Sequence, residues 1–247
     1  MRPVDSHCHL DFDRFDEDRD EVIERCEDEL EFVVVAGCDP ERNQAVKELC
    51  ESEELLVPNY GLHPTFTDSF DELDEVKDQV RDWRPVAIGE IGLDHHHVTD
   101  EDLQEHQEEV FREMLELAEE LDKPVVIHSR SAEKQAIEVL EEYDVTAMFH
   151  CFNGSIELAE RIVENGDYIG VTTQVLYSSR VQKIAENIPL DSMLLETDSP
   201  FLYPDGRNEP VHVLESAEKI GNIKDMSPQQ VMGQTTENAK KLFKPEH

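Results

Sequence analysis

The sequence predicts an α/β protein folded as a closed (β/α)8 barrel, the TIM barrel. Two features of the chain support this fold class. Short apolar, β-branched segments recur at nearly even intervals along the 247 residues, and charged segments with helical periodicity lie between most of them. Strands that alternate with helices form parallel βα units, and eight such units close a barrel of roughly 250 residues. An open, doubly wound sheet is the competing architecture.

The apolar segments define the expected strands in chain order. We expect them at residues 3–7, 32–37, 55–61, 86–89, 124–128, 146–150, 168–172 and 193–196. Helices are expected at 100–121 and 155–165, and Pro58 makes the third strand the least regular. The last helix has a clear start, with Ser227 as N-cap, Pro228 in the first turn and Gln230 as capping-box partner. Neither a linker nor a repeat interrupts the pattern, so residues 1–247 are expected to form one domain.

The composition is strongly acidic. Asp and Glu number 59 against 22 Lys and Arg, which gives a formal net charge of -37. Self-repulsion on this scale destabilises a compact chain, and molar salt removes most of it by shortening the Debye length to ~3 Å. We therefore expect a protein adapted to a high-salt cytoplasm. No apolar run approaches the ~18 residues of a membrane span, and the acidic start lacks the apolar middle of a signal peptide, so a soluble, cytoplasmic protein is expected.

Metal-competent side chains end five of the eight expected strands, and a sixth strand leads into His63. A barrel gathers the carboxyl ends of its strands at one face, where its catalytic groups lie, so this distribution favours the barrel over the open sheet. Satisfied core histidines and ion-paired carboxylates would explain any one of these residues, but they explain the whole set poorly. The candidate metal ligands are His7, His9, Glu90, His128, His150 and Asp198.

These ligands predict a particular chemistry. Four imidazoles and two carboxylates exceed the needs of one tetrahedral ion, so we expect two divalent cations, with Mg, Mn and Zn all compatible with the nitrogen and oxygen donors. Two metals ~3.5–4 Å apart can activate a water and hold the attacking and leaving oxygens of a phosphodiester. The sequence has no G-x-S-x-G, P-loop or H-E-x-x-H motif, so the common hydrolase and NTPase alternatives are excluded. Metal-assisted hydrolysis is therefore expected.

A series of short motifs spans nearly the whole chain. They are D-S-H-C-H-L at 5–10, G-L-H-P at 61–64, G-E-I-G-L-D at 89–94, I-H-S-R at 127–130, F-H-C-F-N-G at 149–154, E-T-D-S-P at 196–200, R-N-E-P at 207–210 and T-x-E-N-A at 235–239. In this combination the sequence resembles the TatD family of metal-dependent deoxyribonucleases, within the amidohydrolase superfamily. Two features depart from the family: the loop before R-N-E-P is short, and acidic residues replace much of the usual basic surface.

The resemblance implies a role for each candidate residue. One metal would be held by His7, His9, Glu90 and Asp198, and a second by His128 and His150 with Glu90 bridging. His63 and Arg130 would lie near the scissile phosphate. Apart from the resemblance, Arg130 and Arg207 are local cations that could anchor a phosphate despite the acidic surface. Glu90, Asp198 and His63 are the expected catalytic residues.

Asp5 and Glu196 share the strand parity of the ligands and should point into the barrel. They would orient imidazoles or bound water, although a buried ion pair unrelated to catalysis is an equally good interpretation. Two other signals are set aside. The tract 95–97 is interpreted as an exposed loop and not as metal ligands, and the EF-hand-like stretch 16–27 has Glu21 where the turn needs glycine, so it is interpreted as the start of the first helix.

The expected function is hydrolysis of DNA phosphodiesters at strand ends, with DNA as the partner; the sequence indicates no membrane or protein partner. An acidic surface repels nucleic acid, so short contacts at a strand end are favoured over a long basic track. A second hypothesis keeps the metals and changes the bond, for example to the ester of an aminoacyl-tRNA, because fold does not determine substrate. A third is a non-catalytic metal-binding protein; structural metal sites usually use cysteines, which are absent from this set.

Overall fold

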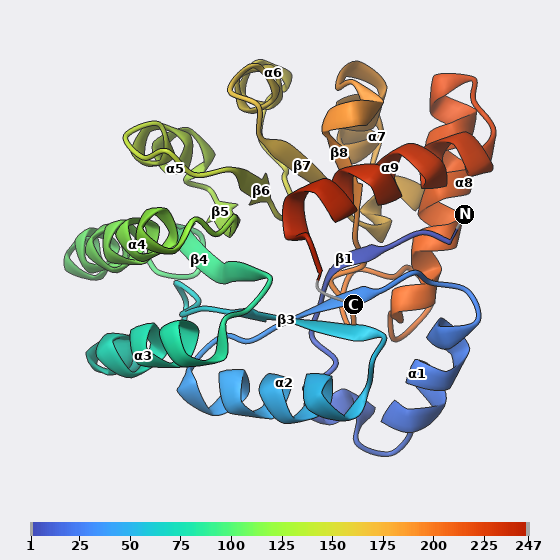
Figure 1. Ribbon diagram of the computed structural model, residues 1–247. Coiled ribbons are helices and arrows are strands. Elements are labelled where there is room, and N and C mark those ends of the chain that lie inside the picture. Colours follow the sequence, from blue (N-terminus) through green and yellow to red (C-terminus); the bar gives the residue numbers. More distant parts are fainter. Residues whose placement is uncertain (1, 246–247) are drawn as a thin grey trace.

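Eight parallel strands surround a central axis and nine α-helices lie outside or across them in the computed structural model, which describes residues 2–245 (Figure 1). The strands form one sheet in the order β1 to β8, and each strand pairs in parallel with the next. The ends of the first and last strands meet through backbone hydrogen bonds from His9 N to Ser199 O (2.8 Å) and from Asp198 N to His7 O (3.0 Å). The predicted (β/α)8 barrel is confirmed.

The strands are β1 Asp5–Cys8, β2 Val33–Ala36, β3 Leu56–Tyr60, β4 Ala87–Asp94, β5 Val125–Arg130, β6 Ala147–Phe149, β7 Tyr168–Val171 and β8 Met193–Leu195. The helices are α1 Arg19–Glu27, α2 Pro40–Ser52, α3 Leu73–Trp83, α4 Glu101–Leu121, α5 Glu133–Leu140, α6 Ile156–Glu164, α7 Ser179–Asn187, α8 Val213–Lys224 and α9 Pro228–Phe243. Short 3-10 helices are η1 Asp13–Phe15, η2 Thr67–Glu72, η3 Thr173–Leu176, η4 Leu190–Ser192 and η5 Pro210–His212.

The main difference from expectation is the length of β4. It was expected to end at residue 89, but its pairing with β5 continues to Asp94 opposite Arg130, with a register shift between Ile88 and Ile91. Glu90 therefore lies inside the strand and not after it. The final helix begins as predicted, with Ser227 and Gln230 forming a capping box and Pro228 in the first turn. The stretch around Asp16 leads into α1, in agreement with the helical interpretation.

Two apolar regions hold the barrel together. The larger lies between strands and surrounding helices, while the smaller fills the amino-terminal end of the barrel and packs against Ala239, Leu242 and Phe243 of α9. Figure 1 shows α9 lying across the barrel. Because apolar side chains occupy this end, the polar side chains inside the barrel collect at the opposite, carboxyl end.

The alternation of side chains along the strands explains this division. Val126 and Met148 belong to the inner apolar region, and two residues further on, with the same orientation, are His128 and His150. β5 and the segment formed by β6 and His150 thus contribute an apolar residue at one end of the barrel and a polar residue at the other. Among the helices in residues 2–245, none combines the length and apolarity that a membrane span requires.

Candidate metal centre

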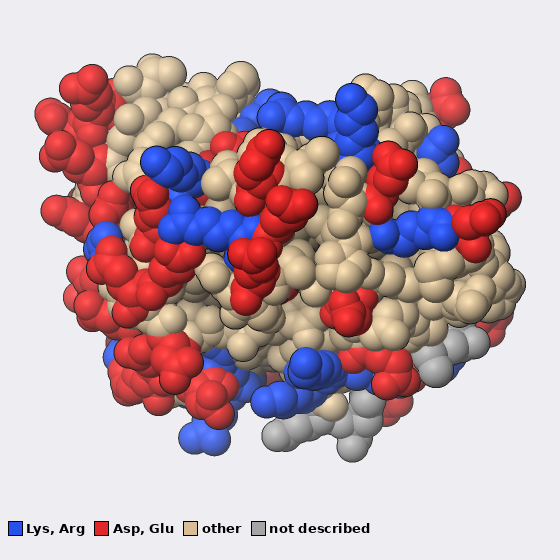
Figure 2. All heavy atoms as spheres, turned by 90° about the horizontal axis from the view of Figure 1, so that it is seen from above, with Lys and Arg blue, Asp and Glu red and all other residues tan. Residues whose placement is uncertain are grey.

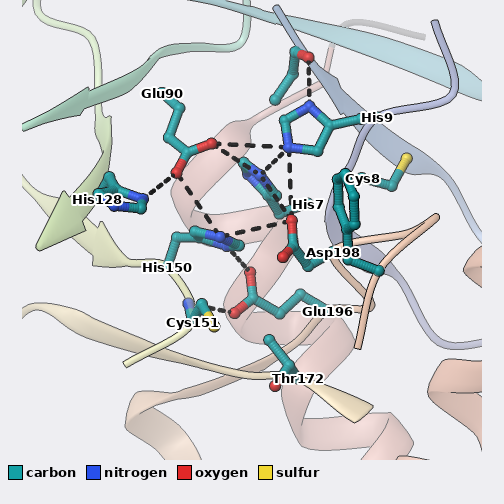
Figure 3. Close-up of polar contacts among 12 residues, drawn as sticks. His7, Cys8, His9, Glu90, His128, His150, Cys151, Thr172, Glu196 and Asp198 are labelled. Atoms are coloured by element: carbon teal, nitrogen blue, oxygen red, sulfur yellow. Dashed lines mark hydrogen bonds and ion pairs between the residues drawn. The ribbon is translucent and has the colours of Figure 1, made fainter. Parts of the chain in front are cut away.

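The six candidate ligands predicted from the sequence converge at the carboxyl end of the barrel (Figure 3). They come from five different strands or the residues that follow them, and their side chains are mostly buried. They are His7 from β1, His9 directly after β1, Glu90 from β4, His128 from β5, His150 after β6 and Asp198 after β8.

Four of these side chains form a compact first group: His7, His9, Glu90 and Asp198. The Nε2 atoms of the two histidines lie 3.2 Å apart. Glu90 Oε2 lies 3.4 and 3.7 Å from them, and Asp198 Oδ1 lies 3.8 and 3.5 Å from them. Donors placed about 2.1 Å from a tetrahedral ion are about 3.4 Å from one another, so the spacing of this group fits a metal ion.

A second group surrounds the other oxygen of Glu90. Its Oε1 atom lies 2.7 Å from His128 Nδ1, 3.3 Å from His63 Nε2 and 3.7 Å from His150 Nε2. His150 Nε2 is also 3.7 Å from Asp198 Oδ1, so the two groups share a boundary. Glu90 thus directs one carboxylate oxygen toward each group, which is the arrangement a bridging ligand requires.

Hydrogen bonds fix which nitrogen two of the imidazoles, His9 and His150, present to the centre. His9 Nδ1 donates to the carbonyl of Ala36 (3.1 Å), and His150 Nδ1 pairs with Glu196 Oε2 (2.7 Å). Both rings therefore present Nε2 to the cavity, because Nδ1 of each ring is engaged in a hydrogen bond. Glu196 is held in turn by the backbone N–H of Cys151 (2.7 Å).

Asp5 is buried beside the ligands but contacts backbone and hydroxyl groups instead of imidazoles. Its carboxylate accepts from Thr197 N (2.9 Å), Thr197 Oγ1 (2.5 Å) and His7 N (3.3 Å). It thereby connects β1 with the segment that carries Asp198. Burial raises the pKa of Asp5 well above its usual value.

Asp94, to which the sequence analysis assigned no role, forms a link from the centre toward solvent. Its Oδ2 atom lies 2.8 Å from His128 Nε2 and 2.9 Å from His97 Nδ1, and Oδ1 accepts from the backbone N–H groups of His96 and His97. His97, set aside in the sequence analysis, thus contacts the carboxylate that holds a candidate ligand. One feature of the sequence points to Asp94: it lies four residues after Glu90, at the end of the same apolar segment.

The charges of the centre are strongly coupled. Although burial disfavours ionisation, the surrounding imidazoles hold the pKa of Glu90 well below its usual value. Burial likewise opposes the charge of His150, but Glu196, Glu90 and Asp198 raise its pKa to about 10. The carboxylates therefore favour positive charge at this point, either as protons on imidazoles or as a metal cation.

The pocket beside the centre has a volume of about 470 Å³ and is lined by His128, His150 and Asp198. Arg130 lines the same pocket. Arg207 lies elsewhere: its guanidinium pairs with both carboxylate oxygens of Asp18 (2.6 Å each) and with Glu209 (3.0 Å), and it stacks on Phe15. A phosphate contact by Arg207 stays a prediction that would require it to exchange these partners.

A cysteine near the ligands was also not anticipated. Cys38 Sγ lies 3.8 Å from His9 Nδ1. Burial raises the pKa of this thiol to about 11. The thiol lies beside Nδ1, the nitrogen that His9 uses to donate to Ala36, and not beside Nε2, which faces the other candidate ligands. The donors that remain are imidazoles and carboxylates, a set that suits Zn, Mn or Mg.

A (β/α)8 barrel with histidines and carboxylates gathered at the carboxyl ends of its strands defines the class of metal-dependent hydrolases. Residues 4–244 match the family described as TatD related DNase, and the chain belongs to this family.

The similarity extends over whole chains. An uncharacterized metal-dependent hydrolase of Methanocaldococcus jannaschii is 35% identical over 249 residues, covering 99% of this chain and 98% of that protein. The human deoxyribonuclease TATDN3 is 33% identical over 257 residues, covering 97% and 94%. The crystal structure of YJJV, a TatD homologue of Escherichia coli, has a TM-score of 0.88 and 28% identity and covers 99% of both chains.

Proposed function

We propose that this metal-dependent hydrolase cleaves DNA phosphodiester bonds at strand ends, using two divalent cations. The observation that carries the proposal is the division of donors around Glu90, which turns one oxygen to His7 and His9 and the other to His128 and His150. The similarity to a human deoxyribonuclease supports DNA as the substrate. The acidic net charge of -37 supports contact with a strand end instead of a long duplex track.

The metals would be held by the two groups already described. When bound, they would polarise the phosphoryl group and lower the pKa of the attacking water. Asp198 lies at the boundary of the two groups, and its side chain is 15% exposed on the pocket side. Although burial opposes ionisation, His150 and His9 lower the pKa of Asp198, so its carboxylate is ionised and can accept the proton of the attacking water.

His63 is placed to hold the phosphate. The backbone N–H of Thr65 donates to His63 Nδ1 (3.2 Å), so the proton of the neutral ring lies on Nε2. Burial lowers the pKa of His63, which keeps the ring neutral at neutral pH. Its Nε2–H therefore serves as a hydrogen-bond donor to a non-bridging phosphate oxygen beside Glu90.

The test is cleavage of end-labelled single-stranded DNA by the purified protein with Mg²⁺ or Mn²⁺. We expect stepwise shortening of linear strands, no cleavage of a circular single strand, and abolition of activity by EDTA and by His128→Ala. His106→Ala is the matched control, because His106 contacts Phe70 away from the ligands. Activity that survives His128→Ala would contradict the two-metal assignment. Metal-dependent cleavage of an ester such as aminoacyl-tRNA, but never of DNA, would favour the alternative substrate class.

A further inference from the structure

We propose that Arg180 and Tyr177 form a subsite for the nucleotide next to the scissile phosphate, with Arg180 binding that nucleotide's phosphate and Tyr177 stacking on its base. This inference rests on the proposed nucleic-acid substrate. It assigns a role to two residues that the motifs of the sequence did not indicate.

The first observation concerns arginine pairing. Residues 2–245 contain all twelve arginines, and eight of them form ion pairs: Arg2, Arg19, Arg25, Arg42, Arg81, Arg112, Arg161 and Arg207. Arg14 lies over the ring of Phe201. Of the three arginines left in the described chain, two, Arg130 and Arg180, line the pocket beside the metal centre. Acidic side chains gather along the left side of the face shown in Figure 2, and over the whole sequence Asp and Glu outnumber Lys and Arg by 59 to 22. An arginine without a carboxylate partner is therefore uncommon among the described residues.

The second observation concerns position. Arg130 is the last residue of β5 and Arg180 lies in the first turn of α7, so they reach the pocket from different elements. Glu133 also lines the pocket but forms no ion pair with either guanidinium within residues 2–245. The same pocket is lined by His128, His150 and Asp198, so the guanidinium groups of Arg130 and Arg180 lie beside the expected position of the scissile phosphate. A guanidinium with free donors is well suited to a phosphate because it can bind two oxygens at once.

The third observation is an exposed aromatic ring at the edge of this pocket. Tyr177 is 51% exposed, and its hydroxyl donates to the carbonyl of Leu202 (3.3 Å), a residue that lines the pocket. Tyr177 follows η3 and precedes α7, the helix that carries Arg180. Aromatic rings beside cationic groups are the usual platform for single-stranded bases, because every base has a face to stack.

The experiment measures binding of fluorescein-labelled (dT)4 by anisotropy in EDTA, so that no cleavage occurs. We expect Arg180→Gln to weaken binding about tenfold and to reduce the slope of log Kd against log KCl by up to about 0.7, the value for one phosphate contact on a single strand. Tyr177→Ala should weaken binding of (dT)4 about tenfold but leave an abasic tetramer unaffected. Arg84→Gln is the matched control, since Arg84 lines a different pocket.

Equal affinities of wild type, Arg180→Gln and Arg84→Gln would overturn the phosphate contact. An equal loss for (dT)4 and the abasic tetramer in Tyr177→Ala would overturn the stacking contact. Cleavage of DNA with Mn²⁺ tests the proposed function separately. If the wild type binds (dT)4 with the expected dependence on Arg180 but never cleaves DNA, the result supports the subsite and contradicts the nuclease activity.

Discussion

Replacing Asp94 by asparagine tests how the centre orients its ligands. The Oδ1 atom can still accept from the backbone N–H groups of His96 and His97, so the loop should keep its fold. The changed atom is Oδ2, which lies 2.8 Å from His128 Nε2. An amide group there donates to Nε2, which moves the ring proton to Nδ1, the atom 2.7 Å from Glu90. His128 then no longer presents a lone pair toward the second group of donors.

The expected magnitude follows from the hydrogen bond that is lost. Removing a carboxylate that orients a ligating histidine costs about 10- to 100-fold in metal affinity, or about 1.4 to 2.7 kcal/mol. Isothermal titration of the metal-free protein with Mn²⁺ measures this loss, and the nitrogen shifts of labelled histidine report the change of tautomer. Asp167→Asn is a matched control, because Asp167 is also buried but accepts from Ala147 N at the other end of the barrel. If both variants bind Mn²⁺ as tightly as the wild type, Asp94 does not position His128.

Three further predictions follow from the structure. Metal affinity should rise with pH up to about 10, because His150, with its pKa raised to about 10, must lose its proton before it can bind a metal. Calorimetric titrations in buffers of different ionisation enthalpy measure the protons released on metal binding. An affinity that does not depend on pH would contradict this prediction. Arg207→Gln should lower the melting temperature slightly, because it removes the solvent-screened pair with Asp18, and should leave KM unchanged. A raised KM with unchanged stability would instead support the phosphate contact. The melting temperature should increase with KCl toward molar concentrations, since salt screens the repulsion of a net charge of -37, and a melting temperature indifferent to KCl would argue against adaptation to high salt.

Strand alternation made much of the centre predictable. In β5 and β6, an apolar residue that fills the barrel is followed two positions later by a polar residue at the centre, as in Val126 with His128 and Met148 with His150. A pattern with a period of two is a local property of the chain, so sequence alone reveals which side chains share a face. The ends of several such strands meet only in a barrel, which is why the fold and the set of candidate ligands could be inferred together.

Two strands do not follow this rule. Val4 and Ala87 fill the barrel, yet His7 and Glu90, three positions later, also face inward, because the register of β1 shifts between Asp5 and Cys8 and that of β4 shifts between Ile88 and Ile91. These shifts depend on pairing with neighbouring strands and have no clear sign in the sequence. The extension of β4 to Asp94 has the same origin.

The sequence by itself determined the barrel, the residue types at its carboxyl end and the kind of metal they suit, because periodicity and donor chemistry belong to individual segments. Only the tertiary structure decided that Asp94 holds His128, that Arg207 is paired with Asp18 and that Arg180 lines the pocket beside the centre with no ion pair to any residue in the range 2–245. The first two depend on a partner that the fold brings close from a distant segment, and the third depends on which side chains the fold places around the guanidinium. In so acidic a protein, an arginine can bind an anionic substrate only where the fold leaves its guanidinium without a carboxylate partner.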